Sequence, residues 1–108
     1  MIAAIHKACI GGGIDMACAC DVRLASADAY FSIREVDIGL AADLGTLQRL
    51  PKIVGNRSLV CELALSARDF SSEEALAMGL LSGVEPTQVL YTYCTCVHCS
   101  CQPLFECP

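Results

Sequence analysis

The chain has 108 residues, and its 12 acidic and 7 basic residues give a formal net charge of −5. This length accommodates one small domain at most. An acidic chain is poorly suited to the phosphate backbone of DNA or RNA, so nucleic-acid binding is excluded as a function class.

The first half of the chain alternates short apolar runs with turns. Residues 2–5 are apolar and predict a buried strand, which indicates that the chain begins inside a fold. Three glycines at 11–13 precede a short helix that is expected to end near Cys20. Two further strands are expected at 22–25 and 29–33, joined by a short turn.

The middle of the chain changes from strand-like to helical patterning. Residues 34–43 show no period and are expected to form a loop. Two helices should follow, over 44–54 with an interruption at a proline, and over 56–66. Asn56 directly precedes the second of these helices and is expected to be its N-cap.

A last helix and strand are predicted before the composition changes. Ser71 and Glu74 have the spacing of a capping box, and the helix that they open should stop at Gly79. The apolar residues 80–84 then predict a strand. Strands that alternate with helices in this way indicate α/β architecture.

The C-terminal segment has a different composition. Residues 86–105 carry no charge, but polar residues and prolines interrupt them too often for a membrane span of roughly 20 apolar residues. We predict a core over 1–85 and a disordered, unrelated tail over 86–108. The tail could form a zinc clip from His98 and four cysteines, at 94, 96, 99 and 101. We prefer a read-through, splice or frame artefact, and predict no metal site.

The remaining cysteines do not indicate a disulfide scaffold. Cys9, Cys18, Cys20 and Cys61 are scattered among apolar residues. Free cysteine behaves as a small hydrophobic residue and is often buried. We therefore expect these four side chains to be buried thiols.

Several motifs in fixed order carry a resemblance to a known family. Residues 9–15 read Cys-Ile-Gly-Gly-Gly-Ile-Asp, residues 19–23 read Ala-Cys-Asp-Val-Arg, and residues 35–51 run from Glu35 through Asp43 to Leu-Gln-Arg-Leu-Pro. This pattern resembles the crotonase superfamily, and most of all its Δ3,5-Δ2,4-dienoyl-CoA isomerase branch. The resemblance implies part of the family's spiral of ββα repeats, truncated at both ends.

The resemblance also implies an activity and its residues. The family branch moves double bonds in 3,5-dienoyl-CoA to give 2,4-dienoyl-CoA during fatty-acid β-oxidation. Asp15, Glu35 and Asp43 match its acidic residues, and the N–H of Gly12 matches one half of its oxyanion hole. Carboxylates in an apolar pocket suit proton transfer, and helix N-terminal amides suit an enolate oxygen. Glu35 and Asp43 are the expected pair, with Asp43 preferred as base, while Asp15 tunes or relays.

Each of these acids has a structural alternative. Asp15 can be a helix N-terminal acid that the helix dipole favours. Glu35 or Asp37 can form an ordinary loop ion pair with Arg34, and we regard Asp37 as structural. Asp43 can be the N-cap of the helix that follows it. The glycines can serve only a tight strand-to-helix turn.

Two other functions stay open beside the isomerase. One is an enoyl-CoA hydratase, which needs acids at the positions of Asp15 and Glu35 but none at Asp43. The other is a non-catalytic truncated variant that associates with intact subunits. On its own the chain is expected to be inactive, because the second oxyanion donor and much of the CoA pocket lie in family portions that it lacks.

The resemblance further implies partners and a compartment. The substrate is an acyl-CoA thioester, no cofactor is needed, and the family forms homotrimers or hexamers. The family works in mitochondria or peroxisomes. The chain itself shows neither a basic and apolar leader nor a Ser-Lys-Leu C-terminus, and we expect no membrane or nucleic-acid partner.

Overall fold

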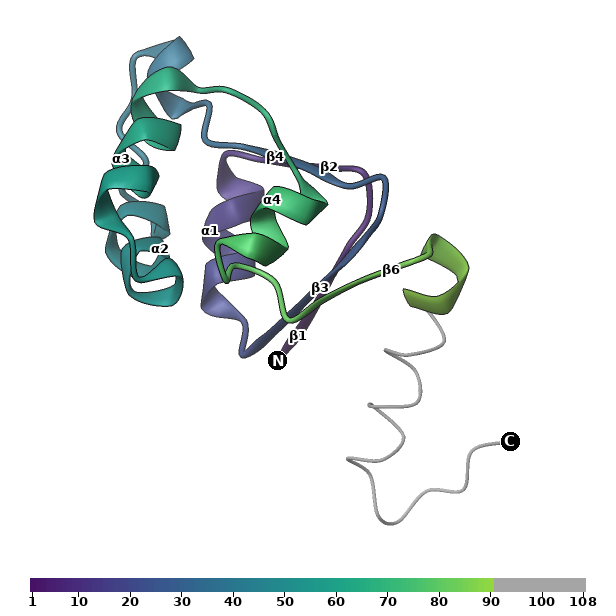
Figure 1. Cartoon of the computed structure of the whole chain (residues 1–108). Coiled ribbons are helices and arrows are strands. Elements are labelled where there is room, and N and C mark those ends of the chain that lie inside the picture. The colour runs from purple at the N-terminus through teal and green to yellow at the C-terminus, as the bar shows by residue number, and fades with distance from the viewer. Residues whose placement is uncertain (91–108) are drawn as a thin grey trace.

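The computed structural model describes residues 1–90. Its strands are β1 Ile2–Ile5, β2 Ala8–Ile10, β3 Val22–Ser26, β4 Tyr30–Ser32, β5 Phe70–Ser71 and β6 Gly83–Glu85. Its helices are α1 Gly12–Ala19, the 3-10 helix η1 Glu35–Ile38, α2 Thr46–Val54, α3 Arg57–Ser66 and α4 Ser72–Ala77 (Figure 1). Residues 87–90 begin a further helical turn within the segment expected to be a tail. The rest of that prediction, from residue 91, lies outside the described residues.

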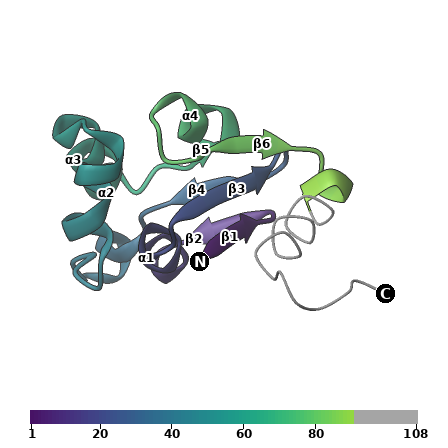
Figure 2. The ribbon, with the colours of Figure 1, turned by 90° about the horizontal axis from the view of Figure 1, so that it is seen from below.

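The strands form two sheets of three strands each. One has the order β1-β3-β6 with parallel neighbours, and the other has the order β2-β4-β5, in which β2 and β4 are parallel and β5 is antiparallel. The strands of each successive pair, β1 with β2, β3 with β4 and β5 with β6, therefore lie in different sheets, and β2, β4 and β5 continue beyond β1, β3 and β6 (Figure 2). Each ββ pair adds one strand to each sheet, which is the arrangement of the expected α/β ββα spiral.

The predicted helix ends are confirmed where a local signal sets them. Asn56 caps α3, since its side chain accepts a hydrogen bond from the Leu59 N–H at 3.1 Å. The Ser71 hydroxyl accepts from the Glu74 N–H at 3.1 Å and opens α4. Pro51 lies inside α2 and does not end it.

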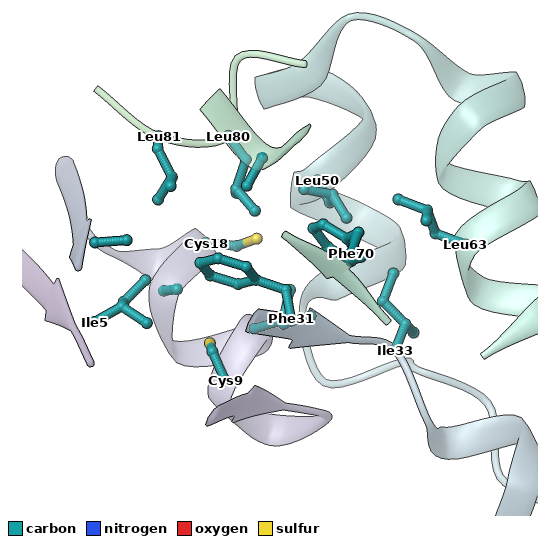
Figure 3. Packing of buried hydrophobic residues seen from close by; sticks show 14 of the residues in the cluster. Ile5, Cys9, Cys18, Phe31, Ile33, Leu50, Leu63, Phe70, Leu80 and Leu81 are labelled. Atoms are coloured by element: carbon teal, nitrogen blue, oxygen red, sulfur yellow. The ribbon is translucent and has the colours of Figure 1, made fainter. Parts of the chain in front are cut away.

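A single apolar cluster joins the strands to the helices. The rings of Phe31 and Phe70 stack with centroids 5.4 Å apart. Cys9 and Cys18 lie beside Phe31, from β2 and α1 respectively (Figure 3). Leu63 brings α3 into the same cluster. The core therefore holds α1 and α3 in fixed positions, and these helices carry or flank the acidic residues.

Four sequence expectations need correction. The loop expected over 34–43 contains the 3-10 helix η1. The short strands β2 and β5 were absent from the pattern, because only pairing with β4 defines them. The last strand covers Gly83–Glu85, while Leu80 and Leu81 are buried in the loop before it. Cys9 and Cys18 are buried as expected, but Cys20 is half-buried and Cys61 is exposed.

Candidate active site

Asp15 joins the N-terminal turns of two helices. It lies in the first turn of α1 and is only 8% exposed. Its Oδ1 accepts hydrogen bonds from the backbone N–H of Thr46 at 2.6 Å and from the Thr46 hydroxyl at 2.7 Å. Thr46 is the first residue of α2, whose N-cap Gly45 has no side chain to offer. Asp15 therefore satisfies an amide that would otherwise lack a partner at that helix end.

The two glycines at the start of α1 have different conformations. Gly11 has φ 53° and ψ −116°, a region that glycine adopts readily and other residues avoid. A Cβ on Gly11 would lie 3.3 Å from Glu35 Oε1, whereas a Cβ on Gly12 would meet nothing within 4 Å. The Gly12 N–H belongs to the first helical turn, where amides have no partner inside the helix. Gly12 also lines the cleft described below, so its N–H is a candidate donor to a ligand there.

Glu35 opens η1 and lies against Gly11. Its Oε2 is buried and has no hydrogen-bond partner among residues 1–90. The neighbouring Arg34 pairs with Asp69 at 2.7 Å, so the alternative of an ion pair with Glu35 or Asp37 is wrong. Buried carboxylate oxygens are usually hydrogen-bonded. Glu35 Oε2 therefore has unused hydrogen-bonding capacity within the described part of the chain.

Asp43 is exposed and lies just before α2. In the described part of the chain its carboxylate accepts no hydrogen bond, and Gly45 rather than Asp43 is the N-cap of α2. The alternative of Asp43 as a helix cap is therefore wrong. Its backbone carbonyl accepts a hydrogen bond from Gln48 Nε2 at 2.7 Å, which fixes the main chain while leaving the carboxylate unbound.

All four residues of the expected site line one cleft. Its volume is about 380 Å³, and its acidic residues come from α1, η1 and the segment before α2. The polar lining is Gly12, Asp15, Arg34, Glu35 and Asp43, and the large apolar lining is Ile10, Ile38, Leu40 and Leu44. Three acids among apolar side chains can take a proton from one carbon and return it at another.

An apolar cavity of about 360 Å³ adjoins this cleft. The two share four wall residues: Glu35, Leu40, Ala41 and Ala42. The remaining wall comes from Ile33, which directly follows β4, and from η1, α2 and α3, and it is almost entirely aliphatic. Among residues 1–90, Glu35 is the only acidic residue in the wall of this cavity. The arrangement can hold a hydrocarbon chain beside the carboxylate.

Thr46 is the site residue that the sequence analysis did not identify. It is fully buried and 31 positions from its partner Asp15. A threonine at the start of a predicted helix is a weak signal, and no local spacing connects it to α1. Within residues 1–90, no three His, Cys, Asp or Glu side chains are grouped so as to hold a metal ion. No helix of this part is long and apolar enough to cross a membrane. The cysteine and histidine group at 94–101 lies outside the described residues.

Comparison with known proteins identifies relatives that are named dienoyl-CoA isomerases, the branch that the sequence resembles. The human mitochondrial Δ(3,5)-Δ(2,4)-dienoyl-CoA isomerase is 59% identical over 86 residues, covering 80% of this chain and 26% of that protein. The peroxisomal enzyme of Arabidopsis thaliana is 62% identical over 84 residues, covering 78% and 30%. The chain thus spans about a quarter of the length of these relatives. The resemblance to the dienoyl-CoA isomerase branch is confirmed.

The fold is confirmed in the same way. A Thermobifida fusca YX protein solved in complex with acetoacetyl-CoA superposes with a TM-score of 0.85 at 31% identity, over 93% of this chain and 39% of that one. The family model described as enoyl-CoA hydratase/isomerase matches residues 1–99. The chain therefore belongs to the enoyl-CoA hydratase/isomerase family.

Proposed function

We propose that this chain supplies the proton-transfer part of an isomerase that converts 3,5-dienoyl-CoA to 2,4-dienoyl-CoA. The observation that carries the proposal is the buried Oε2 of Glu35, which has no hydrogen-bond partner in the described part of the chain and lies beside a cleft that Asp43 and Gly12 also line. The names of relatives at 59% and 62% identity support the substrate class. Its substrate is a CoA thioester, and no further cofactor takes part.

The proposed chemistry removes a proton from C2 of the thioester and returns one at C6. Asp43 enters as a carboxylate and takes the C2 proton, the electron pair moves along the conjugated chain, and Glu35 enters as a carboxylic acid and donates its proton at C6. Proton exchange with water after product release returns Asp43 to the carboxylate and Glu35 to the acid. The negative charge that develops on the thioester oxygen is stabilised by the Gly12 N–H, a donor that needs no reorganisation. The apolar cavity beyond Glu35 holds the hydrocarbon tail past C6.

The complete enzyme contains more than this chain. A second oxyanion donor and most of the CoA pocket belong to further portions of the fold, and subunits associate as trimers or hexamers. The relatives named mitochondrial and peroxisomal favour one of those compartments. Losing one oxyanion donor typically costs roughly 10²–10³ in rate, so residues 1–108 alone are expected to show no measurable turnover.

A segment exchange tests the proposal directly. The part of the human mitochondrial relative that matches this chain is replaced by this chain's own segment, and the ultraviolet band of the 2,4-conjugated product is followed. The chimera should turn over 3,5-dienoyl-CoA. Glu35→Gln and Asp43→Asn should each lower kcat by roughly 10²–10⁴, because the amide keeps its shape but cannot exchange a proton, while substrate binding stays nearly intact.

The matched control is Asp37→Asn. Asp37 is an exposed acid of η1, the 3-10 helix that also carries Glu35, but it lines neither the cleft nor the apolar cavity. Removing its charge should therefore leave turnover unchanged. Full activity of the Asp43→Asn chimera would contradict the proposed role of this acid. Addition of water to a 2-enoyl-CoA without diene isomerisation would favour the hydratase, and binding without either reaction would favour the non-catalytic variant.

A further inference from the structure

The most deeply buried polar contact of the site joins α1 to the segment that carries Asp43. Thr46 is fully buried, and both its backbone N–H and its hydroxyl donate to Asp15 Oδ1, at 2.6 and 2.7 Å. A buried hydroxyl and a buried carboxylate are costly unless paired. The two groups satisfy each other, so this contact has one strongly preferred geometry.

Nearby backbone bonds extend this geometry to Asp43. The Leu47 N–H donates to the Ala42 carbonyl at 3.1 Å, and the Asp43 N–H donates to the Ala41 carbonyl at 2.9 Å. Thr46 is therefore fixed to α1, and the turn before it is fixed to Leu47, the next residue of α2. The Asp43 carboxylate has no hydrogen bond of its own among the described residues, so its position depends on this main chain.

We propose that Thr46 is a positioning residue that acts with Asp15 to hold the Asp43 segment against α1. This inference rests on the proposed function, because it assigns Asp43 a reaction to be positioned for. It gives Asp15 a specific part: its Oδ1 is occupied by two donors from α2, and it holds the proton-transfer residue in place. Thr46 itself is not among the residues that line the cleft.

The first test uses residues 1–108 and needs no activity. Amide hydrogen exchange is measured for Asp43 and Leu47 in the wild type, Thr46→Val and Thr46→Ser. Valine keeps the shape but removes the hydroxyl donor, and a hydrogen bond to a charged group corresponds to a factor of roughly ten or more in a local equilibrium. Exchange at Asp43 and Leu47 should accelerate by about that factor in Thr46→Val and return to the wild-type rate in Thr46→Ser.

A matched control separates this effect from general destabilisation. Ser72 is also buried, and its hydroxyl donates to the Ala27 carbonyl at 3.0 Å, but it lies on α4 and lines neither cavity. Ser72→Ala removes a comparable buried hydrogen bond and should leave exchange at Asp43 and Leu47 unchanged relative to core amides. Equal exchange at those two amides in the wild type and Thr46→Val would overturn the inference.

The second test uses the chimera and separates kcat from KM. Thr46→Val should lower kcat by roughly tenfold with little change in KM, since misplacing a reacting group affects the chemical step. Thr46→Ser should restore kcat, and Ser72→Ala should leave both constants unchanged. A normal kcat in Thr46→Val would overturn the positioning role. A chimera without any turnover contradicts the proposed function instead, and the exchange rates still decide whether Thr46 holds the segment.

Discussion

The two glycines at the start of α1 should respond to alanine in opposite directions. Gly11 has φ 53°, and a Cβ there would lie 3.3 Å from Glu35 Oε1. A residue other than glycine in such a conformation costs about 1–3 kcal/mol. Gly12 is the first residue of α1, and a Cβ there would meet nothing within 4 Å. Alanine at a compatible glycine position stabilises by about 0.4–1 kcal/mol, mainly by restricting the unfolded chain.

The measurement is urea unfolding of residues 1–108, followed by far-ultraviolet circular dichroism. The Gly11→Ala midpoint should fall and the Gly12→Ala midpoint should rise, with m-values unchanged. In a thermal scan each kcal/mol corresponds to roughly 4–8 °C for a domain of this size. Equal midpoints for the two variants, or a lower midpoint for Gly12→Ala, would refute the reasoning from backbone conformation.

Gly11→Ala should also lower the activity of the chimera. In the Gly11→Ala chimera the Glu35 carboxylate has to shift by a few tenths of an ångström to make room for the new methyl group. A misplacement of about 1 Å can cost roughly 10² in rate, so a smaller but measurable loss of kcat is expected. Unchanged kcat in a folded Gly11→Ala chimera would mean that the rate does not depend on the exact position of the Glu35 carboxylate.

Three further predictions concern thiols and caps. Iodoacetamide should alkylate the exposed Cys61 in the native chain well before the buried Cys9 and Cys18, as read by peptide mapping; equal labelling would contradict the packing. Burial raises the pKa of the Cys9 and Cys18 thiols from 9.0 to about 11. The stability gained from keeping both thiols protonated in the folded state is therefore fully present below pH 9 and is lost as pH rises towards 11. The urea midpoint should fall in that window, and it should fall less in Cys9→Ala. Asn56→Ala should cost about 1 kcal/mol of stability and Asn56→Ser much less; equal costs would contradict the cap.

Local signals made much of the helical structure predictable. Asn56 and Ser71 cap the helices that their spacing predicted, because a cap acts within three residues of its position. Helical period could also have placed Cys61 correctly. Val60 and Leu63 form the buried side of α3, and the residue directly after Val60 lies about 100° around the helix from it.

Long-range partners set the features that the sequence did not reveal. β2 exists only by pairing with β4, and it has three residues. The four site residues were nominated by resemblance, and the fold brings them to one cleft. The hydrogen bonds of the site were not predictable. Thr46 and Asp15 are far apart in the chain, and the sequence around one residue contains no signal for the other. The ion pair of Arg34 was not predictable for the same reason. Arg34 pairs with the distant Asp69 and not with the acidic residues next to it in the sequence.

The sheet β1-β3-β6 joins strands that are separated by very different lengths of chain. β1 pairs with a strand about 20 residues further along the chain, whereas β3 pairs with β6 about 60 residues further along. Loop-closure entropy grows with the logarithm of loop length, so the second pairing costs about 1 kcal/mol more to initiate. Loop closure therefore favours formation of the β1–β3 pair before β6 joins the sheet.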